Sequence, residues 1–381
     1  MNVGVTTFGG DGGRSGIGRY ITQLLRALAT LDNGAQWQVA AHADEASVFM
    51  PDAPHWKLSA LSGRWRSPVA NVAWHQLSLP SWCRAGKQDV LFLPAGNRRL
   101  PWRCPCPSVG VVHDFSALHV AAKYDPARMF YIKTVLPALI RRLTHVITIS
   151  ESSRQDLLDY ARVPADRITV TPLGADHGFF NPGDRGRAAS AVLEQTGVTA
   201  PYLLYVSRLE HPGKNHVRLI RAFDEAKSRN DLPHRLVLAG SDWSGSDQVR
   251  AAAGAARHRD SITFLGFVPG ALLPDLYRAA DAVVFPSLFE GFGLPVLEAM
   301  CCATPVACSN VSSLPEVAGD AALLFNPMDE GDIARAIGRI TTEPALRADL
   351  VARGLGRAAL HTWENTARLT WKVLSNAAKT A

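Results

Sequence analysis

The sequence contains no apolar run approaching the roughly 18 to 20 residues that a helix needs to cross a bilayer. Its first residues, MNVGVTTFGG, lack the basic and apolar regions of a secretory signal and are typical of a first β-strand instead. Both absences favour a protein that stays in the cytoplasm.

Cysteine is scarce, and its spacing argues against two kinds of site. The six cysteines form no C-x-x-C pair and no Cys/His array with zinc spacing. We therefore expect neither a disulfide framework nor a bound metal. The thiols are expected to be reduced and mostly buried.

Two nucleotide-binding motifs are also missing. No G-x-x-x-x-G-K-[ST] occurs, which argues against a P-loop NTPase. The glycine-rich segment 9–18 does not complete G-x-G-x-x-G, because Ser15 and Ile21 stand where the last glycine is required, so an NAD site is disfavoured. Glycines before a helix still let backbone amides approach an anion closely. A simple turn is the alternative.

The remaining pattern is that of a two-domain α/β protein. The chain has 381 residues, enough for two domains of ~150 to 200 residues. Its 47% hydrophobic and 19% charged residues argue against disorder, collagen-like repeats and long coiled coils. Short apolar segments alternate with helical patterns, which predicts parallel sheets. The expected strands are residues 2–8, 89–93, 108–112 and 145–149, then 202–208, 235–241, 261–267, 281–287 and 304–310.

The alternation breaks between Pro172 and Pro201, where PLGADHGFFNPGDRGR and a short helical stretch indicate a linker. We therefore expect a first domain at 1–178 and a second at 179–362. In the last segment, 363–381, Trp363 and Trp371 stand eight residues apart and indicate a helix with one apolar face. We expect this helix to pack back on the first domain.

Positive charge is concentrated in the first half of the chain. Residues 1–183 hold 19 Lys+Arg and 13 Asp+Glu, whereas residues 184–381 hold 21 of each. The first half also has tryptophans beside bases, as in Arg64-Trp65-Arg66. This pattern suits an anionic membrane surface or acceptor, or else core tryptophans beside a solvated basic face. Five tryptophans lie between positions 56 and 102, namely Trp56, Trp65, Trp74, Trp82 and Trp102, and several stand beside bases, as also in the stretch from Arg98 to Arg103.

Ligands of parallel α/β sheets bind beyond the carboxyl ends of the strands. Arg208 and Lys214 follow the expected strand 202–208, and two cations there suit a diphosphate, because arginine holds two oxygens and lysine adds a compact charge. Two surface bases at a helix start are the alternative.

His113 and Asp114 follow another strand, where an imidazole can contact a sugar hydroxyl or transfer a proton. A structural pair at a strand end is the alternative there.

The segment EGFGLPVLE concentrates two carboxylates around a tight loop. Glu290 is expected at the end of a strand, and Pro295 suits the first position of a helix whose first turn includes Glu298. Anions are favoured near a helix N-terminus, so Glu298 is expected to accept hydrogen bonds from sugar or ribose hydroxyls. A helix-start glutamate with no ligand is the alternative.

These glutamates resemble the paired E-x-seven-E motif of the retaining family-4 glycosyltransferases, and the resemblance covers most of the chain. It implies the GT-B fold, in which two Rossmann-like parallel-sheet domains face each other across a cleft. The matching segments are GIGRYI at 16–21, VVHD at 111–114, TISESS at 148–153, TPLGAD at 171–176, VSRLEHPGKNH at 206–216, LGFVP at 265–269, LYRAADAVVFPSLFEGFGLPVLEAM at 276–300 and SSLPEVAGDAALLFNP at 312–327.

The resemblance implies a role for each matching residue. Arg208 and Lys214 correspond to the pair that binds the donor diphosphate, Glu298 to the carboxylate on the ribose, and His113 to the residue near the reacting sugar. One departure is Ser15 before Gly16, where relatives often carry two adjacent glycines. The expected catalytic residues are His113, Asp114, Arg208, Lys214 and Glu290. The expected donor-binding residues are Gly16, Ser207, Arg208, Lys214, Gly240, Glu290 and Glu298, with Phe267 and Val268 beside the base and Gly291, Phe292, Gly293 and Leu294 beside the sugar.

Within the family, the chain is most similar to bacterial mannosyltransferases that assemble exopolysaccharide or O-antigen repeats on a polyprenyl-diphosphate lipid. This implies transfer of mannose from GDP-mannose, without metal or cofactor, to a lipid-linked oligosaccharide at the inner face of the cytoplasmic membrane. Nucleic acid is not an expected partner. Retention proceeds by same-face attack or through a covalent intermediate, and the lack of an identifiable nucleophilic carboxylate favours the first route.

Other functions on the same fold remain open at this point. They are transfer from a UDP- or dTDP-sugar, epimerisation of a sugar nucleotide, and binding of a sugar nucleotide without turnover. A phosphorylase is disfavoured, because no local pattern singles out a lysine for a pyridoxal Schiff base.

Overall fold

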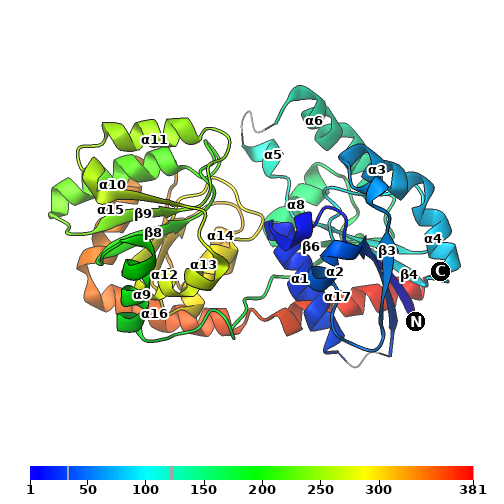
Figure 1. Cartoon of the computed structure of the whole chain (residues 1–381). Helices are drawn as coiled ribbons and strands as arrows, with labels where there is room; N and C mark the ends of the chain where they lie inside the picture. Colours follow the sequence, from blue (N-terminus) through cyan, green and yellow to red (C-terminus); the bar gives the residue numbers. More distant parts are fainter. Residues whose placement is uncertain (32–33, 121–123, 381) are drawn as a thin grey trace. The chain divides into compact units, whose positions relative to one another are not determined.

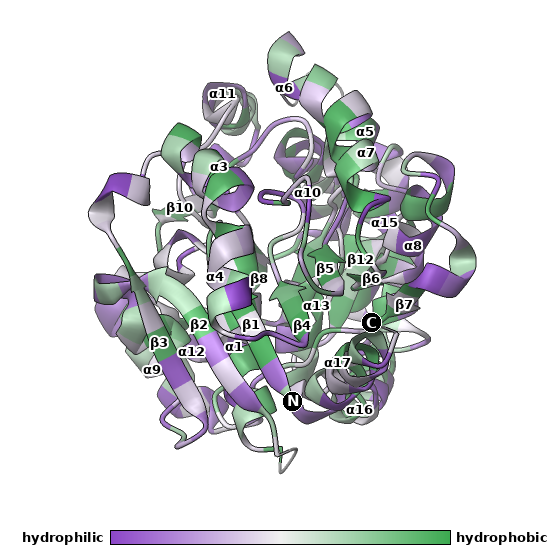
Figure 2. Cartoon of the chain, turned by 90° about the vertical axis from the view of Figure 1, so that its right-hand side faces the viewer, coloured by the Kyte–Doolittle hydropathy of each residue, from purple (hydrophilic) through white to green (hydrophobic). Residues whose placement is uncertain are grey.

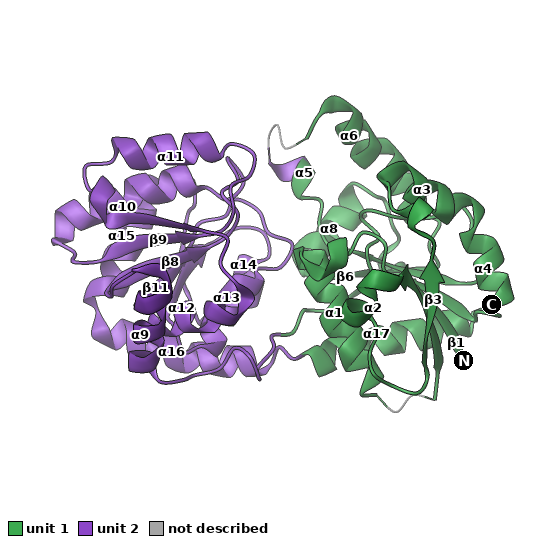
Figure 3. Cartoon of the chain, in the orientation of Figure 1, with its two compact units in different colours: residues 1–117, 124–174, 363–381 green, residues 118–123, 175–362 purple. Residues whose placement is uncertain are grey.

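The computed structural model describes residues 1–31, 34–120 and 124–380, which form two α/β units (Figure 1). The first unit contains residues 1–117, 124–174 and 363–381, and the second contains residues 118–123 and 175–362 (Figure 3). The main division falls between Gly174 and Ala175, a few residues before the expected boundary at 178.

The first unit is built on a seven-stranded parallel sheet with the order β3-β2-β1-β4-β5-β6-β7. Its inner strands are almost wholly apolar, as the green of β4, β5 and β6 in Figure 2 shows, because helices cover both faces of such a sheet. The strands are β1 (Asn2–Thr6), β2 (Gln36–His42), β3 (Trp56–Leu61), β4 (Val90–Leu93), β5 (Ser108–Val112), β6 (His145–Thr148) and β7 (Ile168–Val170).

Helices pack on the first sheet through large apolar side chains. Helix α17 (Trp363–Ala378) lies against β4, β5 and β6 and packs on α1 (Gly16–Ala29). Trp82, on α4 (Leu79–Ala85), packs over β1 at Gly4, where an added Cβ would lie 3.0 Å from the indole ring. The other helices are α2 (Ala46–Phe49), α3 (Pro68–Leu77), α6 (Pro126–Phe130), α7 (Leu136–Ile140) and α8 (Glu151–Asp159), while α5 (Ser116–His119) has its first two residues in this unit and its last two in the second.

The second unit repeats this architecture with six parallel strands in the order β10-β9-β8-β11-β12-β13. Helices α10, α11 and α15 lie on one side of the sheet and α9, α12, α13 and α16 on the other (Figure 1). The strands are β8 (Tyr202–Val206), β9 (Arg235–Ala239), β10 (Ile262–Gly266), β11 (Ala282–Phe285), β12 (Val306–Ser309) and β13 (Leu323–Phe325). The helices are α9 (Arg185–Thr196), α10 (His216–Asn230), α11 (Ser246–Ala255), α12 (Leu273–Ala279), α13 (Leu294–Cys301), α14 (Leu314–Ala318), α15 (Glu330–Thr342) and α16 (Pro344–Ala359).

The predicted α/β fold with two Rossmann-like parallel sheets is confirmed, and both strand orders are those of the doubly wound type. The order reverses between β1 and β4 in the first sheet and between β8 and β11 in the second. The strands that the sequence did not predict are β2, β3, β7 and β13, two of which are only three residues long. None of the helices in the described ranges combines the length and apolarity needed to cross a membrane.

A tryptophan cluster closes one edge of the first core. The ring of Trp37 on β2 stacks on Trp56 of β3 at 4.5 Å, and its centroid lies 6.0 Å from that of Trp371 on α17. The C-terminal helix and the edge of the sheet therefore share one apolar cluster.

Replacement of Trp37 by alanine should lower the free energy of unfolding by about 3–5 kcal/mol, because neighbouring side chains would fill only part of the cavity that the indole leaves. The control Leu360→Ala removes an exposed side chain and should change stability by about 0.5 kcal/mol or less. Urea unfolding followed by circular dichroism measures both. Equal effects of the two substitutions would contradict a structural role for the tryptophan cluster.

Candidate active site

Two loops meet where the strand order of the second sheet reverses. The first loop follows β8 and carries Ser207, Arg208 and Lys214, and the second follows β11 and carries Glu290. The Leu288 N–H donates to Gly213 O at 2.9 Å, which joins the two loops through their backbones. Such a switch point is where ligands bind in open α/β sheets.

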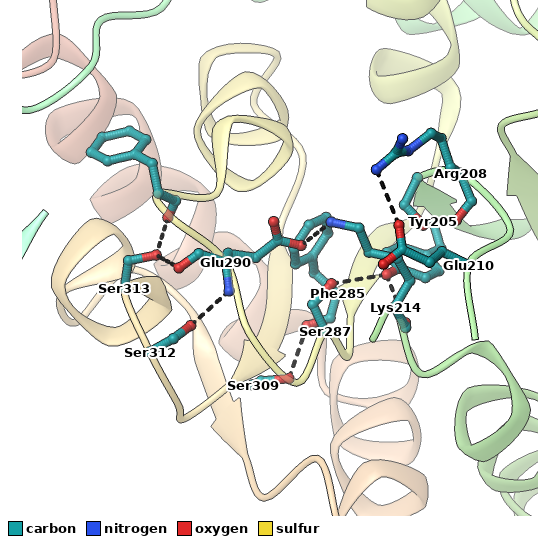
Figure 4. Close-up of polar contacts among 12 residues, drawn as sticks. Tyr205, Arg208, Glu210, Lys214, Phe285, Ser287, Glu290, Ser309, Ser312 and Ser313 are labelled. Carbon is teal, nitrogen blue, oxygen red and sulfur yellow. Dashed lines mark hydrogen bonds and ion pairs between the residues drawn. The ribbon is translucent and has the colours of Figure 1, made fainter. Parts of the chain in front are cut away.

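An ion pair joins the same two loops through side chains. Lys214 Nζ lies 2.6 Å from Glu290 Oε1, and the two side chains are only 19% and 15% exposed (Figure 4). Partial burial reduces screening by salt and water, so the attraction within this pair is stronger than in a fully exposed ion pair. The ammonium has three donors, and the bond to Glu290 uses one of them.

Asn215 fixes the position of Lys214. Its backbone is left-handed (φ 59°), and its side-chain Nδ2 donates to Pro286 O at 3.0 Å and to Pro327 O at 2.7 Å. The Tyr205 hydroxyl donates to Lys214 O at 2.8 Å. The lysine therefore projects from a backbone that is held on both sides.

Arg208 is held by an acid and an aromatic ring. Its Nη2 lies 3.0 Å from Glu210 Oε2, and its guanidinium lies 4.6 Å from the ring centroid of Trp243. Half of the arginine side chain is exposed, whereas Glu210 is buried. The cation is thus oriented while its remaining donors face solvent.

Gly240 allows the backbone of Ser207 to approach closely. Its φ is 155°, and an added Cβ would lie 1.9 Å from Ser207 O, so only glycine fits at this position. The Ser207 hydroxyl lies 3.2 Å from His216 Nε2. Burial lowers the pKa of His216 to about 3, so the imidazole beside Ser207 is neutral at neutral pH.

The Glu290 loop is held by two serines after β12. Ser312 Oγ accepts from the Glu290 N–H at 3.0 Å, and Ser313 Oγ lies 2.9 Å from Glu290 O and 2.7 Å from Phe292 O. The expectation that Glu290 ends a strand is wrong. Strand β11 ends at Phe285, because Pro286 has no N–H for the ladder.

Gly293 occupies the N-cap of α13 with φ 110°, so the helix begins at Leu294 and not at Pro295 as expected. The side chain of Phe292 is buried beside His361, at 5.8 Å between ring centroids. Gly291, Phe292 and Gly293 are buried, and the contact of this loop with a donor sugar stays a prediction.

Glu298 lies just beyond the first turn of α13 and is buried. The Tyr277 hydroxyl, on α12, donates to Glu298 Oε2 at 3.0 Å. A buried carboxylate requires such partners, and the tyrosine fixes its orientation.

Phe267 and Val268 follow β10, and the Phe267 ring is 77% exposed. The Gly240 N–H donates to Gly266 O at 2.8 Å, which connects this segment to the end of β9. An exposed aromatic ring at the carboxyl edge of a sheet suits the stacking of a flat ligand.

The first unit holds the remaining predicted residues, Gly16, His113 and Asp114, at the carboxyl edge of its own sheet. Gly16 is the first residue of α1, and an added Cβ there would meet no atom within 4 Å. Ser15 caps the helix by accepting from the Gly18 N–H at 3.2 Å. Arg98 donates to Gly9 O at 2.8 Å and pairs with Asp11, which fixes the glycine-rich loop.

His113 is buried between Tyr20 and the chain after β4. Its Nε2 lies 2.9 Å from Pro94 O. Because a carbonyl only accepts, Nε2 carries the proton and Nδ1 is the acceptor of the neutral ring. Burial lowers the pKa of His113 to about 4, which favours hydrogen bonding to a hydroxyl over donation as an imidazolium. Asp114 Oδ1 accepts from the Ser116 N–H at 2.9 Å, as in an Asx turn.

The structure therefore gathers Ser207, Arg208, Lys214 and Glu290 at one switch point, while the roles assigned to all the predicted residues stay predictions. The sequence reasoning missed four residues that support this set, namely Glu210, His216, Trp243 and Tyr277. Glu210 and His216 lie inside the segment 206–216 and Tyr277 inside the segment 276–300, both of which were singled out, whereas Trp243 gave no local signal. Within the described ranges, no group of three or more His, Cys, Asp or Glu side chains has the arrangement of a metal site.

Comparisons with known proteins cover nearly the whole chain. Residues 194–356 match the family model Glycosyl transferases group 1, and residues 14–179 match Glycosyltransferase Family 4. The O-antigen chain mannosyltransferase B of Escherichia coli is 30% identical over 92% of this chain and 93% of its own length. A D-inositol 3-phosphate glycosyltransferase of Frankia alni is 28% identical over 94% of each chain.

Solved structures share the fold at low sequence identity. The sucrose-phosphate synthase of Thermosynechococcus elongatus superposes with a TM-score of 0.76 at 22% identity, over all of both chains. Anabaena Alr3699/HepE in complex with UDP-glucose superposes with a TM-score of 0.75 at 18% identity, over 99% of this chain and 100% of that one.

If Tyr277 orients Glu298 toward a ligand, Tyr277→Phe should weaken the binding of a nucleoside diphosphate by about 1.5–3 kcal/mol, the range for a hydrogen bond to a charged group. Isothermal titration calorimetry measures the affinity. Tyr202→Phe is the matched control, because it removes another buried hydroxyl, which donates to Leu276 O at 2.7 Å. Equal loss of affinity in both variants would assign Tyr277 a purely structural role.

Proposed function

Because this chain belongs to the glycosyltransferases described by the group 1 and family 4 models, we propose that it transfers mannose from GDP-mannose to a polyprenyl-diphosphate-linked oligosaccharide during bacterial surface polysaccharide synthesis. The observation that carries the proposal is the pair of cations, Arg208 and Lys214, at the switch point of the second sheet. The likeness to an O-antigen chain mannosyltransferase over 92% of the chain supports the choice of sugar.

In the proposed reaction, the glycosyl bond to the diphosphate breaks and negative charge develops on the leaving oxygen. Arg208 and Lys214 are fixed before the reaction by Glu210, Trp243 and Glu290, so they stabilise this charge without reorganisation. They provide the positive charge in this scheme, and the nucleotide sugar is a substrate that needs no further cofactor.

We propose that the sugar keeps its anomeric configuration by same-face attack, in which the leaving phosphate oxygen accepts the proton of the acceptor hydroxyl. Glu290 already forms an ion pair with Lys214 at 2.6 Å. This contact is more suitable for a carboxylate that positions the donor sugar than for a carboxylate that attacks the sugar. We further propose that the enzyme works at the inner face of the cytoplasmic membrane, where a lipid-linked acceptor would reside.

A second candidate is transfer from a UDP-sugar. It is supported by the UDP-glucose complex of Anabaena Alr3699/HepE, whose fold this chain shares. The two donors differ in the nucleotide base and in the sugar. One binding experiment with different nucleotide sugars can compare both.

A donor panel tests the proposal. Purified protein is heated with GDP-mannose, UDP-glucose, ADP-glucose or a dTDP-sugar, because a ligand that binds only the folded state raises the melting temperature. GDP-mannose should give the largest shift, and incubation with a lipid-linked acceptor should then release GDP and form an α-linked product, identified by NMR. A larger shift with UDP-glucose would favour the second candidate, and release of a changed nucleotide sugar without acceptor would indicate an epimerase.

Arg208→Ala and Lys214→Ala should each lower kcat/KM by an amount equivalent to about 2–4 kcal/mol, because each removes a fixed charge from the leaving group. Arg221→Ala provides the control, since Arg221 lies on α10 after the same loop and forms an exposed ion pair with Glu330. Steady-state turnover with the preferred donor measures all three. Near-normal rates for both site variants would refute the role of the cation pair.

A further inference from the structure

Helix α3 presents an outward face without any charged residue. Its ten residues, PVANVAWHQL, include no Lys, Arg, Asp or Glu. Val69 is 81% exposed and Leu77 is 73% exposed, and Val72 is also exposed. Surface helices normally carry charged or polar residues on the side that faces solvent. A single exposed apolar residue needs no explanation, but a group of them does.

The exposed residues form one side of the helix. Val69 and Val72 are three residues apart and therefore neighbours, half-buried Gln76 follows four residues after Val72, and exposed Leu77 comes next in the chain. The opposite side of α3 is buried through Asn71, Trp74 and His75. The outward side chains thus belong to a helix whose inner face is fully packed.

Internal contacts hold this helix in place. The Trp74 ring lies 5.0 Å from that of Phe8, and Arg99 Nε donates to the Asn71 side chain. Ser67 caps the helix by accepting from the Ala70 N–H at 3.3 Å. The apolar face is therefore a preformed surface that needs no refolding to be used.

Tryptophan and arginine stand together at both ends of α3. Before the helix, the Arg64 guanidinium lies 4.7 Å from the Trp65 ring centroid. After it, the exposed Trp102 donates its backbone N–H to Gln76 Oε1 at 2.8 Å, and the Arg142 guanidinium lies 4.1 Å from its ring centroid. Amphipathic rings beside cations are typical of groups placed at the boundary of a lipid bilayer.

The surrounding sequence is strongly basic. Residues 63–142 contain 12 Lys+Arg and 3 Asp+Glu. Arg98 and Arg99 are used internally, because they bind Gly9 O and the Asn71 side chain, whereas Arg64, Arg103 and Arg142 are exposed. The charge next to the apolar face is therefore complementary to an anionic surface.

We propose that the α3 patch, defined as Val69, Val72, Leu77 and Trp102, docks on an anionic lipid bilayer. The apolar side chains would enter the boundary between headgroups and acyl chains, and the neighbouring arginines would contact the lipid phosphates. Burial of apolar surface and electrostatic attraction act together in such binding. The inference rests on the proposed function for its biological setting. It adds the surface with which the protein approaches a membrane-borne acceptor.

Co-sedimentation with vesicles tests this inference with the full-length protein. The protein should bind vesicles that contain 30 mol% phosphatidylglycerol, and it should bind pure phosphatidylcholine vesicles at least tenfold more weakly. Raising the salt from 0.1 to 0.5 M should weaken the binding to anionic vesicles, because the electrostatic part is screened. Absence of binding to anionic vesicles at 0.1 M salt would overturn the proposal.

The variant Val69→Gln/Leu77→Gln places glutamine, a good helix former, at both positions and should bind anionic vesicles at least tenfold more weakly than the natural chain. The matched control, Leu193→Gln/Leu360→Gln, replaces two exposed leucines of the second unit and should bind normally. Equal binding of both variants would overturn the proposal. A second result would also overturn the proposal. If the natural chain forms a dimer in gel filtration, and the α3 variant loses this dimer but binds vesicles as before, then the face contacts a second copy and not a bilayer.

The thermal shift with GDP-mannose separates this proposal from the proposed function. The α3 variant should keep the full shift, which also shows that it is folded. If the natural chain shows no shift with any nucleotide sugar but still binds anionic vesicles through α3, the proposed function fails and the docking surface stands.

Discussion

The hydrogen-bonded pair of Lys214 and Glu290 is the interaction on which the candidate site depends. It links the loop after β8 to the loop after β11, where the strand order of the second sheet reverses. Both side chains are mostly buried, and an isolated ion in such a place is costly. Two oppositely charged groups brought to the same edge of a parallel sheet stabilise each other and leave further donors for a ligand.

The geometry of this edge is set by the backbone as much as by side chains. Gly240 lets the chain pass Ser207 at a distance that no Cβ would permit, and Gly293 takes a left-handed conformation at the start of α13. Asn215 does the same before α10 and ties Lys214 to two neighbouring segments. Rigid strand ends and fixed turns thus orient the charged groups before any ligand is present.

The sequence singled out the charged residues that the structure brings to one switch point, but it did not predict the contacts that hold them. Position after a strand was enough to single out Arg208 and Lys214, because the carboxyl ends of parallel strands share one edge, and the tight loop in EGFGLPVLE singled out Glu290. Tyr277 and Trp243 were not found, since their bonds to Glu298 and Arg208 join segments 21 and 35 residues apart in the sequence. Only the packing of α12 on α13 and the path of the loop after β9 bring them together.

The amino-acid sequence by itself determined the α/β class, the two sheets and the order of most strands along the chain, because alternating apolar runs and helical patterns are local properties. The tertiary structure decided how the basic, tryptophan-rich half is used. Trp56 and Trp74 are buried in the core, Arg98 and Arg99 bind the glycine-rich loop and α3, and Trp102 remains exposed beside Arg142. Burial of a given tryptophan depends on which segments pack around it, and these come from distant parts of the chain that composition alone does not relate.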